Sequence, residues 1–442
     1  MPEKTRNAVT RRDFLRRAGA GAAGVAVLPN IVPAAVLGRG GRPAPSERVV
    51  MGCIGVGGQG SHNMRGFLGI PEVQMVAVCD VDRDHRETAQ NAVNEHYARV
   101  TDGKHKGCDG YNDFRELLAR DDIDGVMIAT PDHWHGLVSL AAAKAGKDMY
   151  CEKPLAHSIA EGKAVVDAVT KYRRVLQTGS HERSRDNARY ACELVRNGRI
   201  GKLHTIHVNL PIDNHGPIDN QPAMEVPDGL DYDMWLGPAQ WEPYTEKRCH
   251  FHFRYILDYS GGEVTDRGAH IIDLGQLGNG TDETGPTEVW GWGDFPKDGL
   301  FNTAMDFQFE FNYANGVHMI CAQQTPRGIK FEGDEGWVFI HIHGGHLEAS
   351  SPALLQEVIG PDEHKLGRSP GHHKDFVNNV KTRGTPMAPV WAGHRSASMC
   401  QLGNIAMLLG RRLKWDPDAE QFVGDDEANR MLMAHMRAPW HI

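Results

Sequence analysis

A glycine-rich loop at residues 55–60 is the first feature of the chain that could support chemistry. Its sequence, Gly-Val-Gly-Gly-Gln-Gly, gives Gly55, Gly57 and Gly60 the G-x-G-x-x-G spacing. Glycines at these positions permit a tight turn, close approach of a pyrophosphate and close packing of a helix on a strand. Asp80 ends the next apolar run, where a carboxylate would accept hydrogen bonds from ribose hydroxyls and repel a 2′-phosphate. The pattern predicts a site that favours NAD over NADP.

A lysine, an aspartate and a histidine could supply the groups that oxidation of a secondary alcohol requires. His270 is the best candidate for the base that takes the hydroxyl proton, because histidine has the unperturbed pKa nearest neutrality. Asp266 and Asp273 would share a helix face with His270, and Asp266 would orient the substrate. Lys153 would hold the alcohol oxygen and stabilise a developing alkoxide. The simpler alternatives are helix capping or a surface pair for Asp266 and His270, and a solvated surface lysine for Lys153.

The elements that must position these residues begin with alternating strands and helices. Strands are predicted over residues 48–54, 73–79, 123–130, 148–151 and 175–178, and helices over 112–120, 135–145 and 159–172. Such alternation predicts an α/β Rossmann domain, a parallel sheet doubly wound by helices. Ligands of these sheets bind beyond the carboxyl ends of the strands, where residues 129–135 and 151–154 fall.

The rest of the chain predicts a second domain with a different kind of sheet. Residues 306–313 alternate strictly and place Phe307, Phe309 and Phe311 on one face. Strands are also indicated at residues 287–292, 317–323 and 337–343, and helices at 373–413. This period is typical of antiparallel sheets with one packed face. A chain of this length is too long for one ordinary core and fits two domains.

Three ordered motifs resemble those of the Gfo/Idh/MocA oxidoreductases. Residues 129–135 read Ala-Thr-Pro-Asp-His-Trp-His, and residues 152–154 read Glu-Lys-Pro, the signature of that family. Residues 261–270 resemble its second signature, an Asp-x-x-x-His segment after a glycine pair. The resemblance runs from about residue 48 to the C-terminus. It implies a Rossmann domain followed by an α+β domain with a large, mostly antiparallel open sheet, whose helices near residues 373–413 return to the Rossmann domain.

The resemblance also implies roles for particular residues. Catalysis would fall to Lys153, Asp266 and His270, as the residue types already suggest. Substrate-facing positions would fall to Arg183 and Arg254, either of which could equally form a surface ion pair, and to Asp273. The residues expected to bind the cofactor are Gly55, Gly57, Gly58, Gln59, Gly60, Asp80, Thr130, Pro131, His135, Glu152 and Lys153. The resemblance further implies action on sugars, polyols or related hydroxy compounds, and a homo-oligomer assembled through the C-terminal sheet.

The N-terminal segment predicts export of the folded chain. Residues 10–16 read Thr-Arg-Arg-Asp-Phe-Leu-Arg, a twin-arginine signal, before a stretch too short and glycine-rich for a stable membrane anchor. We expect a signal peptide at 1–38, a linker at 39–47, the Rossmann domain at 48–178 and the second domain at 179–442. The Tat translocase would carry the chain to the periplasm with NAD already bound, and the cofactor would be retained because free NAD is scarce there. The alternative is a disordered basic N-terminus.

Composition excludes several classes of partner and ligand. The net charge of −9, without a long basic run, argues against nucleic acid. Eight cysteines are scattered without a Cys-x-x-Cys pair, and the sequence leaves open whether any form disulfides. No metal site is expected among the 24 histidines. His250 and His252 share a predicted strand face, as do His341 and His343, yet no carboxylate or cysteine joins them at ligand spacing.

Three functions stay open on the sequence. The leading hypothesis is a periplasmic NAD-dependent oxidoreductase that acts on a secondary hydroxyl of a sugar, polyol or glycoside with a tightly held, internally recycled cofactor. The second is a redox-neutral glycoside hydrolase, lyase or epimerase that works through a transient keto-sugar. The known NAD-dependent glycosidases of this fold carry a different residue where Lys153 stands, which argues against simple transfer of their activity. The third is a non-catalytic NAD- or sugar-binding protein, which the joint presence of Lys153, Asp266 and His270 disfavours.

Overall fold

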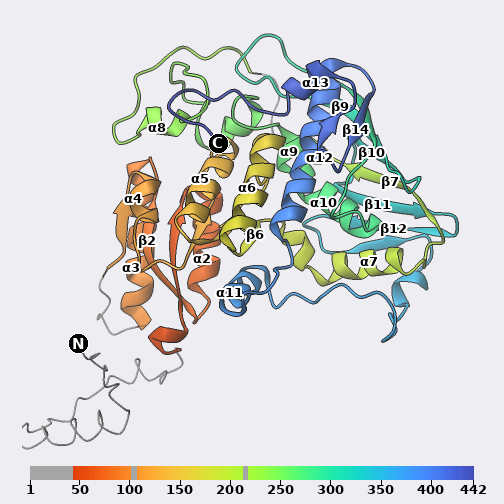
Figure 1. Cartoon of the computed structure of the whole chain (residues 1–442), viewed down its shortest axis with the longest axis horizontal. Coiled ribbons are helices and arrows are strands. Elements are labelled where there is room, and N and C mark those ends of the chain that lie inside the picture. The colour runs from red at the N-terminus through yellow and green to blue at the C-terminus, as the bar shows by residue number, and fades with distance from the viewer. Residues whose placement is uncertain (1–42, 101–106, 213–217) are drawn as a thin grey trace, which may run out of the picture. The chain divides into compact units, whose positions relative to one another are not determined.

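The structure is a computed structural model that describes residues 43–100, 107–212 and 218–442 (Figure 1). The chain divides into two compact units, Met1–Glu47 and Arg48–Ile442. The predicted signal peptide at 1–38 and residues 39–42 of the predicted linker at 39–47 lie outside the described residues. Within the first unit a short 3-10 helix, η2 (Pro45–Glu47), is described. Both predicted domains lie in the second unit.

A six-stranded parallel sheet forms the first half of the second unit, as predicted. Its strand order is β3-β2-β1-β4-β5-β6. The outer strands are short, whereas β1, β4 and β5 are buried on both faces, which explains their nearly continuous apolar sequences. The strands are β1 (Val49–Ile54), β2 (Val73–Cys79), β3 (Asp109–Tyr111), β4 (Gly125–Ile128), β5 (Asp148–Cys151) and β6 (Leu176–Thr178).

Helices connect these strands and cover the sheet. They are α2 (Gly58–Leu68), α3 (Arg83–Val100), α4 (Phe114–Leu118), α5 (Asp132–Lys144) and α6 (Ile159–Tyr172). The sequence did not predict α3 or the strand β3 that follows it. Helix α3 is strongly polar and buries only Ala89, Val93 and Tyr97, so its apolar periodicity is faint. In contrast, Ser158 caps α6 by accepting a hydrogen bond from the backbone of Glu161, a clear helix-start signal.

A nine-stranded sheet in the order β13-β12-β11-β7-β10-β9-β8-β14-β15 forms the second half. Neighbouring strands are antiparallel except β7 and β10, which pair parallel. The large, mostly antiparallel sheet is therefore confirmed. Its strands are β7 (Leu203–Asn209), β8 (Glu288–Asp294), β9 (Asp306–Asn312), β10 (His318–Ala322), β11 (Gly328–Gly333), β12 (Gly336–His341), β13 (Leu347–Ala349), β14 (Leu413–Asp416) and β15 (Gln421–Phe422).

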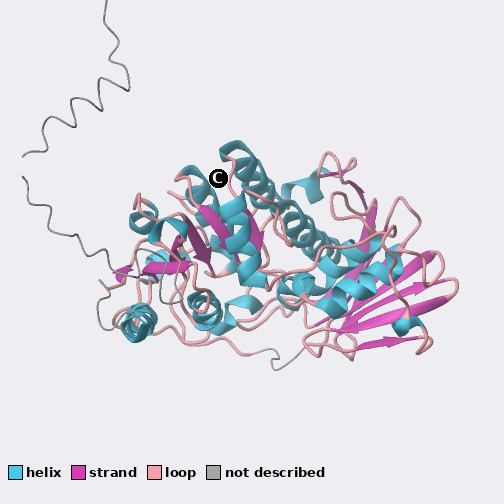
Figure 2. Cartoon of the chain, turned by 90° about the horizontal axis from the view of Figure 1, so that it is seen from below, coloured by secondary structure: helices cyan, strands magenta, loops and turns pink. Residues whose placement is uncertain are grey.

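Helices pack on one face of this sheet (Figure 2). They are α7 (Asp186–Arg196), α10 (Gly268–Asn279) and α12 (Val390–Leu409). Phe307, Phe309 and Phe311 lie on the packed face and are at most 1% exposed, as their alternation predicted. The sheet therefore holds α10, which carries His270, rigidly over its centre.

The C-terminal helices reach back to the first sheet. Helix α11 (His372–Thr382) inserts Phe376, Val377 and Val380 into the Rossmann core beside Val49. Helix α12 contacts α6 and β6 as well as the second sheet. The two halves therefore share a packed boundary, and the candidate site lies along it.

The remaining helices are short. They are η3 (His181–Ser184), α8 (Tyr232–Leu236), η4 (His250–Tyr255), α9 (Glu263–Asp266), η5 (Leu354–Gln356) and α13 (Asp426–Arg430). The expectation of a strand at His250 and His252 is wrong, because both lie in η4. No helix in the described parts of the chain is long and apolar enough to span a membrane. All eight cysteines are free and buried.

Candidate active site

A cleft opens at the carboxyl ends of the first sheet's parallel strands, where the sequence predicted ligand binding. Its walls come from the glycine loop, the ends of β2, β4 and β5, and segments of the second half. Every residue predicted to bind the cofactor lines it. These residues are Gly55, Gly57, Gly58, Gln59, Gly60, Asp80, Thr130, Pro131, His135, Glu152 and Lys153. Arg254 and Asp266 line the same cleft.

The backbone conformation of the glycine loop and the space around it suit a dinucleotide. Gly55 adopts a positive φ of 78°, which L side chains rarely adopt. A Cβ on Gly60 would lie 2.0 Å from the carbonyl oxygen of Gly55, so only glycine allows α2 to start so close to β1. A Cβ on Gly58 would meet no protein atom within 4 Å, which leaves open space before the N-terminus of α2. Free N–H groups at a helix N-terminus suit a pyrophosphate.

Asp80 lines the cleft directly after the end of β2. Its Oδ2 accepts a hydrogen bond from the backbone N–H of Val56 at 2.8 Å, and its Oδ1 accepts one from Asp82 at 2.9 Å. The carboxylate therefore braces the glycine loop while still lining the cleft. His85 lies 3.8 Å away, and its pKa is raised, chiefly by hydrogen bonding to Asp80.

Cofactor choice should follow from the charge at Asp80. We expect calorimetry at fixed salt to give an NAD affinity roughly 10²-fold above that for NADP, because a 2′-phosphate would face a like charge. Asp80→Asn keeps a hydrogen-bond acceptor for the Val56 N–H but removes the negative charge. In this variant the affinities for NAD and NADP should differ by no more than about tenfold. Equal affinities in the wild-type protein would contradict the prediction.

Glu152 anchors the segment before the lysine. It is buried, and its Oε1 accepts hydrogen bonds from Asn63 at 2.7 Å and Gln59 at 3.3 Å. Gly179 passes so close that a Cβ there would lie 2.6 Å from Glu152 Oε2. Glu152 therefore ties α2 to the end of β5 and fixes where Lys153 begins.

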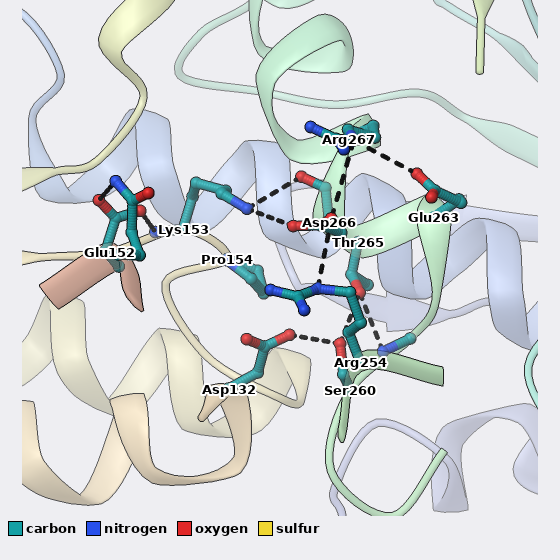
Figure 3. Close-up of polar contacts among 12 residues, drawn as sticks. Asp132, Glu152, Lys153, Pro154, Arg254, Ser260, Glu263, Thr265, Asp266 and Arg267 are labelled. Carbon is teal, nitrogen blue, oxygen red and sulfur yellow. Dashed lines mark hydrogen bonds and ion pairs between the residues drawn. The ribbon is translucent and has the colours of Figure 1, made fainter. Parts of the chain in front are cut away.

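Lys153 and Asp266 form the centre of the candidate site (Figure 3). Lys153 Nζ donates to Asp266 Oδ1 at 2.6 Å and to the Asp266 carbonyl oxygen at 3.2 Å. The side chains are only 16% and 15% exposed. Burial opposes the charge on Lys153, but the carboxylates of Asp266 and Glu152 outweigh it and raise its pKa. Lys153 is therefore an ammonium donor in this state rather than a base.

Two arginines share the Asp266 carboxylate. Arg254 Nε lies 3.5 Å and Arg267 Nε 3.8 Å from Asp266 Oδ2 (Figure 3). Burial alone would raise the pKa of Asp266, yet Lys153 and Arg254 hold it well below its usual range. Glu263 nearby is affected in the opposite direction, because burial and Asp266 raise its pKa to about 7. Arg254 thus lines the cleft and pairs with Asp266, and its contact with substrate stays a prediction.

Buried polar groups join the two halves below this pair. Ser260 Oγ donates to Asp132 Oδ2 at 2.5 Å (Figure 3), and burial raises the pKa of Asp132. His135 has one ring nitrogen 2.6 Å from the Pro154 carbonyl oxygen and the other 2.9 Å from that of Thr130. These contacts fix the loops after β4 and β5 relative to each other.

His270 is not among the described residues that line the cleft, and its neighbours differ from those expected. Asp266 and His270 do not share one regular helix, because α9 ends at Asp266 and α10 starts at Gly268. The ring of His270 lies 4.6 Å from that of His181 and 5.8 Å from that of His343. Burial, then the positive charge of Lys153, lowers the pKa of His270. The histidine is therefore neutral, which a base requires, and its role as the base stays a prediction.

Arg183 and Asp273 have each other as partners. Arg183 Nε donates to Asp273 Oδ2 at 2.6 Å, and Arg183 Nη2 donates to Asp282 at 2.5 Å. Ser396 donates to the other oxygen of Asp273 at 2.6 Å. Arg183 is 5% exposed and Asp273 is 0% exposed. The structure thus gives the pair an internal role in holding α10, and substrate contact by either residue stays a prediction.

The comparisons with known proteins agree with this geometry. Residues 49–180 match the family model described as "Oxidoreductase family, NAD-binding Rossmann fold", and residues 215–442 match "Oxidoreductase family, C-terminal alpha/beta domain". The chain belongs to the Gfo/Idh/MocA family. The resemblance drawn from the three sequence motifs is therefore confirmed, and the first half is an NAD-binding Rossmann domain.

Curated relatives within this Gfo/Idh/MocA group cover only part of the chain. A "Glycosyl hydrolase family 109 protein" of Saccharopolyspora erythraea is 32% identical over 217 residues, 46% of this chain and 45% of its own length. An "Alpha-N-acetylgalactosaminidase" of Shewanella oneidensis is 32% identical over 214 residues, 44% of each chain. The alignments thus span less than half of these relatives.

Solved structures of the Gfo/Idh/MocA fold match more of the chain at lower identity. The WlbA dehydrogenase of Bordetella pertussis, in complex with NADH and UDP-GlcNAcA, gives a TM-score of 0.61 at 15% identity over 84% of this chain and 99% of that one. The aldose-aldose oxidoreductase of Caulobacter crescentus, complexed with glycerol, gives 0.58 at 18% identity over 83% and 99%. At these identities the likeness establishes the fold.

The sequence missed several residues that the structure brings to the site. Asn63 lies one helical turn after Gln59. This spacing could have indicated a second hydrogen-bond donor to Glu152. Ser260 and Asp132 come from segments 128 residues apart, and no local pattern joins them. The same holds for His181 and His343, which only the fold brings beside His270.

Proposed function

We propose that the chain is an NAD-dependent enzyme acting on a secondary hydroxyl of a sugar, polyol or glycoside. The observation that carries the proposal is the buried Lys153–Asp266 pair, 2.6 Å apart, in the cleft that the glycine loop forms. NAD, when bound there, would accept a hydride from the carbon that carries the hydroxyl.

The pair suits this chemistry because its charges are fixed before substrate arrives. Lys153 stays protonated through its carboxylate neighbours and can stabilise oxygen-centred negative charge as it develops. Asp266 stays ionised and holds Lys153 in place through two hydrogen bonds. His270, neutral and close to Lys153, is our candidate for receiving the hydroxyl proton.

A redox-neutral net reaction is the second candidate, and the curated relatives favour it. Two of them are called glycosyl hydrolase family 109 protein and alpha-N-acetylgalactosaminidase. Oxidation of one hydroxyl to a ketone acidifies the neighbouring C–H, so a base can take that proton while the substituent on the next carbon leaves with its bonding electrons and gains a proton. Water then adds to the resulting enone, and return of the hydride to the ketone completes a net hydrolysis. The first steps match those of a dehydrogenase, so the same cleft could support either outcome.

Export would make cofactor retention necessary. We infer from the twin-arginine motif at residues 10–16 that the folded chain leaves the cytoplasm with NAD bound. Replacing Arg11 and Arg12 together with lysine should abolish accumulation of the protein in the periplasmic fraction, while cytoplasmic protein stays folded. A normal periplasmic yield of the double variant would overturn the export proposal and leave the catalytic one standing.

The net reaction can be tested with protein purified without added cofactor. We expect native mass spectrometry to find NAD on the chain and expect steady conversion of glycosides, α-N-acetylgalactosaminides among them, without added NAD. Free NADH should not accumulate in step with product. Activity that needs millimolar NAD and releases one NADH per turnover would identify an ordinary dehydrogenase and contradict internal recycling.

A further inference from the structure

Three histidines from separate segments meet beside the candidate active site. His181 comes from η3 after β6, His270 from α10, and His343 from the loop after β12. One nitrogen of each lies within 4.8 Å of one nitrogen of each of the others. The rings of His181 and His343 are stacked at 5.5 Å, and the ring of His270 stands edge-on to both. The three ligand nitrogens therefore lie near one another, and the parallel rings of His181 and His343 have to turn before both can point at one ion.

The geometry is close to that of a three-histidine metal site. Some point lies within about 2.8 Å of three atoms that are at most 4.8 Å apart, and a Zn–N bond measures about 2.0–2.1 Å. Side-chain movements of under about 1 Å would therefore complete the coordination. Nδ1 of His270 is buried without a hydrogen-bond partner in a side chain that is only 5% exposed. A buried, unpartnered imidazole nitrogen is costly unless something binds it.

A buried carboxylate stands next to the histidines. Glu182 is 1% exposed, and its Oε1 lies 3.2 Å from Nε2 of His181 and 3.9 Å from Nε2 of His343. Among the described residues, Arg185 is the one cation other than the histidines that forms an ion pair with Glu182, and its Nε lies 3.0 Å from Oε1. Neither oxygen of Glu182 forms a hydrogen bond with a described residue. Its contacts with the histidines are therefore electrostatic, and the buried negative charge beside the imidazoles favours a bound cation. The nearby positive charge of Lys153 is matched by Asp266.

We propose that His181, His270 and His343 bind one divalent transition-metal ion of the zinc class. Three imidazoles suit zinc, cobalt and nickel, and three protein ligands leave a coordination position open. His181 and His343 are 36% and 33% exposed, so that position faces the solvent side rather than the core. An oxygen of water or of a carbohydrate could occupy it. Only this last point rests on the proposed function, and the metal site itself does not.

The site differs from two other clusters in the described residues. Asp82, His85 and His250 gather in the cofactor cleft and would be covered by the cofactor. His341, His346 and Glu348 lie at the edge of the second sheet, where His346 and Glu348 are 61% and 56% exposed. The exposed cluster serves as a matched control, because it has the same ligand types without burial.

The test is metal binding by the full chain without a polyhistidine tag. After chelation and dialysis, the protein is titrated with Co²⁺, and the visible absorption of bound Co²⁺ is followed; Zn²⁺ content is then measured by elemental analysis. We expect roughly one ion per chain. His181→Ala and His343→Gln should each weaken binding by about 100-fold or more, and Glu182→Gln by about 10–100-fold. His346→Ala should leave it unchanged.

Melting temperature and NAD affinity of each variant serve as controls that the chain is folded. Because NAD binding is measured separately, absence of the metal leaves the roles proposed for the cofactor, Lys153 and Asp266 standing, and failure of those roles does not bear on the metal. A bound ion would occupy one nitrogen of His270, so the proton of the substrate hydroxyl would then have to go to its other nitrogen or to another group. Absence of a stoichiometric ion in the wild type would overturn the proposal. So would full binding by folded His181→Ala and His343→Gln, or loss of the ion in His346→Ala alone.

Discussion

Lys153→Met is expected to lower kcat by roughly 10²–10³-fold, the cost of removing one donor to a developing oxyanion. Methionine fills a similar volume but offers no proton to a substrate oxygen. The NAD affinity should fall far less than kcat, because the glycine loop and Asp80 are untouched. Turnover of a carbohydrate substrate and calorimetry with NAD measure the two effects.

Removal of Lys153 also leaves Asp266 with only two more distant arginines, at 3.5 and 3.8 Å. The double variant Lys153→Met, Asp266→Asn removes both charges and is the control for this effect. If the double variant regains stability, the destabilisation of Lys153→Met comes from the uncompensated charge on Asp266. The activity of the double variant does not separate the two residues, because both are proposed to act in catalysis. Near-normal kcat in folded Lys153→Met would remove the lysine from the mechanism.

Gly60→Ala is expected to destabilise the cofactor-free chain by about 1–3 kcal/mol. The new Cβ would lie 2.0 Å from the carbonyl oxygen of Gly55, which belongs to backbone and cannot rotate away. Helix α2 would have to shift from β1, and the distorted loop should bind NAD poorly. Urea unfolding and calorimetry measure the two changes.

Gly58→Ala is the matched control for stability. It lies two residues earlier in the same helix, and its Cβ would meet no protein atom within 4 Å. Alanine favours helix over glycine, so the cofactor-free stability of Gly58→Ala should not fall. A loss as large as that of Gly60→Ala would show that the argument from close packing is wrong.

The sequence predicted the first half of the fold well because its signals are local. The strands β2 and β5 and the helix α6 match the predicted ranges, since apolar runs and a capping serine mark them directly. Helix α3 was missed because a polar helix with three buried side chains leaves little periodicity. η4 was taken for a strand because the alternation of histidine and phenylalanine over residues 250–253 imitates one.

The residues of the candidate site that belong to sequence motifs could be predicted, whereas those that only the fold brings together could not. Lys153 and Asp266 lie 113 residues apart, yet their signatures predicted that they act together, and the structure joins them. The partners of Arg183 were not predictable, because Asp273 and Asp282 become neighbours through the packing of η3 on α10. His181, His270 and His343 likewise meet only in three dimensions.

The most direct test of the central claim is a single-turnover measurement on the chain loaded with one equivalent of NAD. After rapid mixing with a panel of glycosides, sugars and polyols, absorbance of the reduced nicotinamide is followed together with product. If the bound cofactor takes hydride from the carbohydrate, this absorbance should rise before product appears or together with it. In Lys153→Met the rise should be roughly 10²–10³-fold slower. Product formed by cofactor-free protein, or formed with NAD bound but without any transient reduction, would contradict the account.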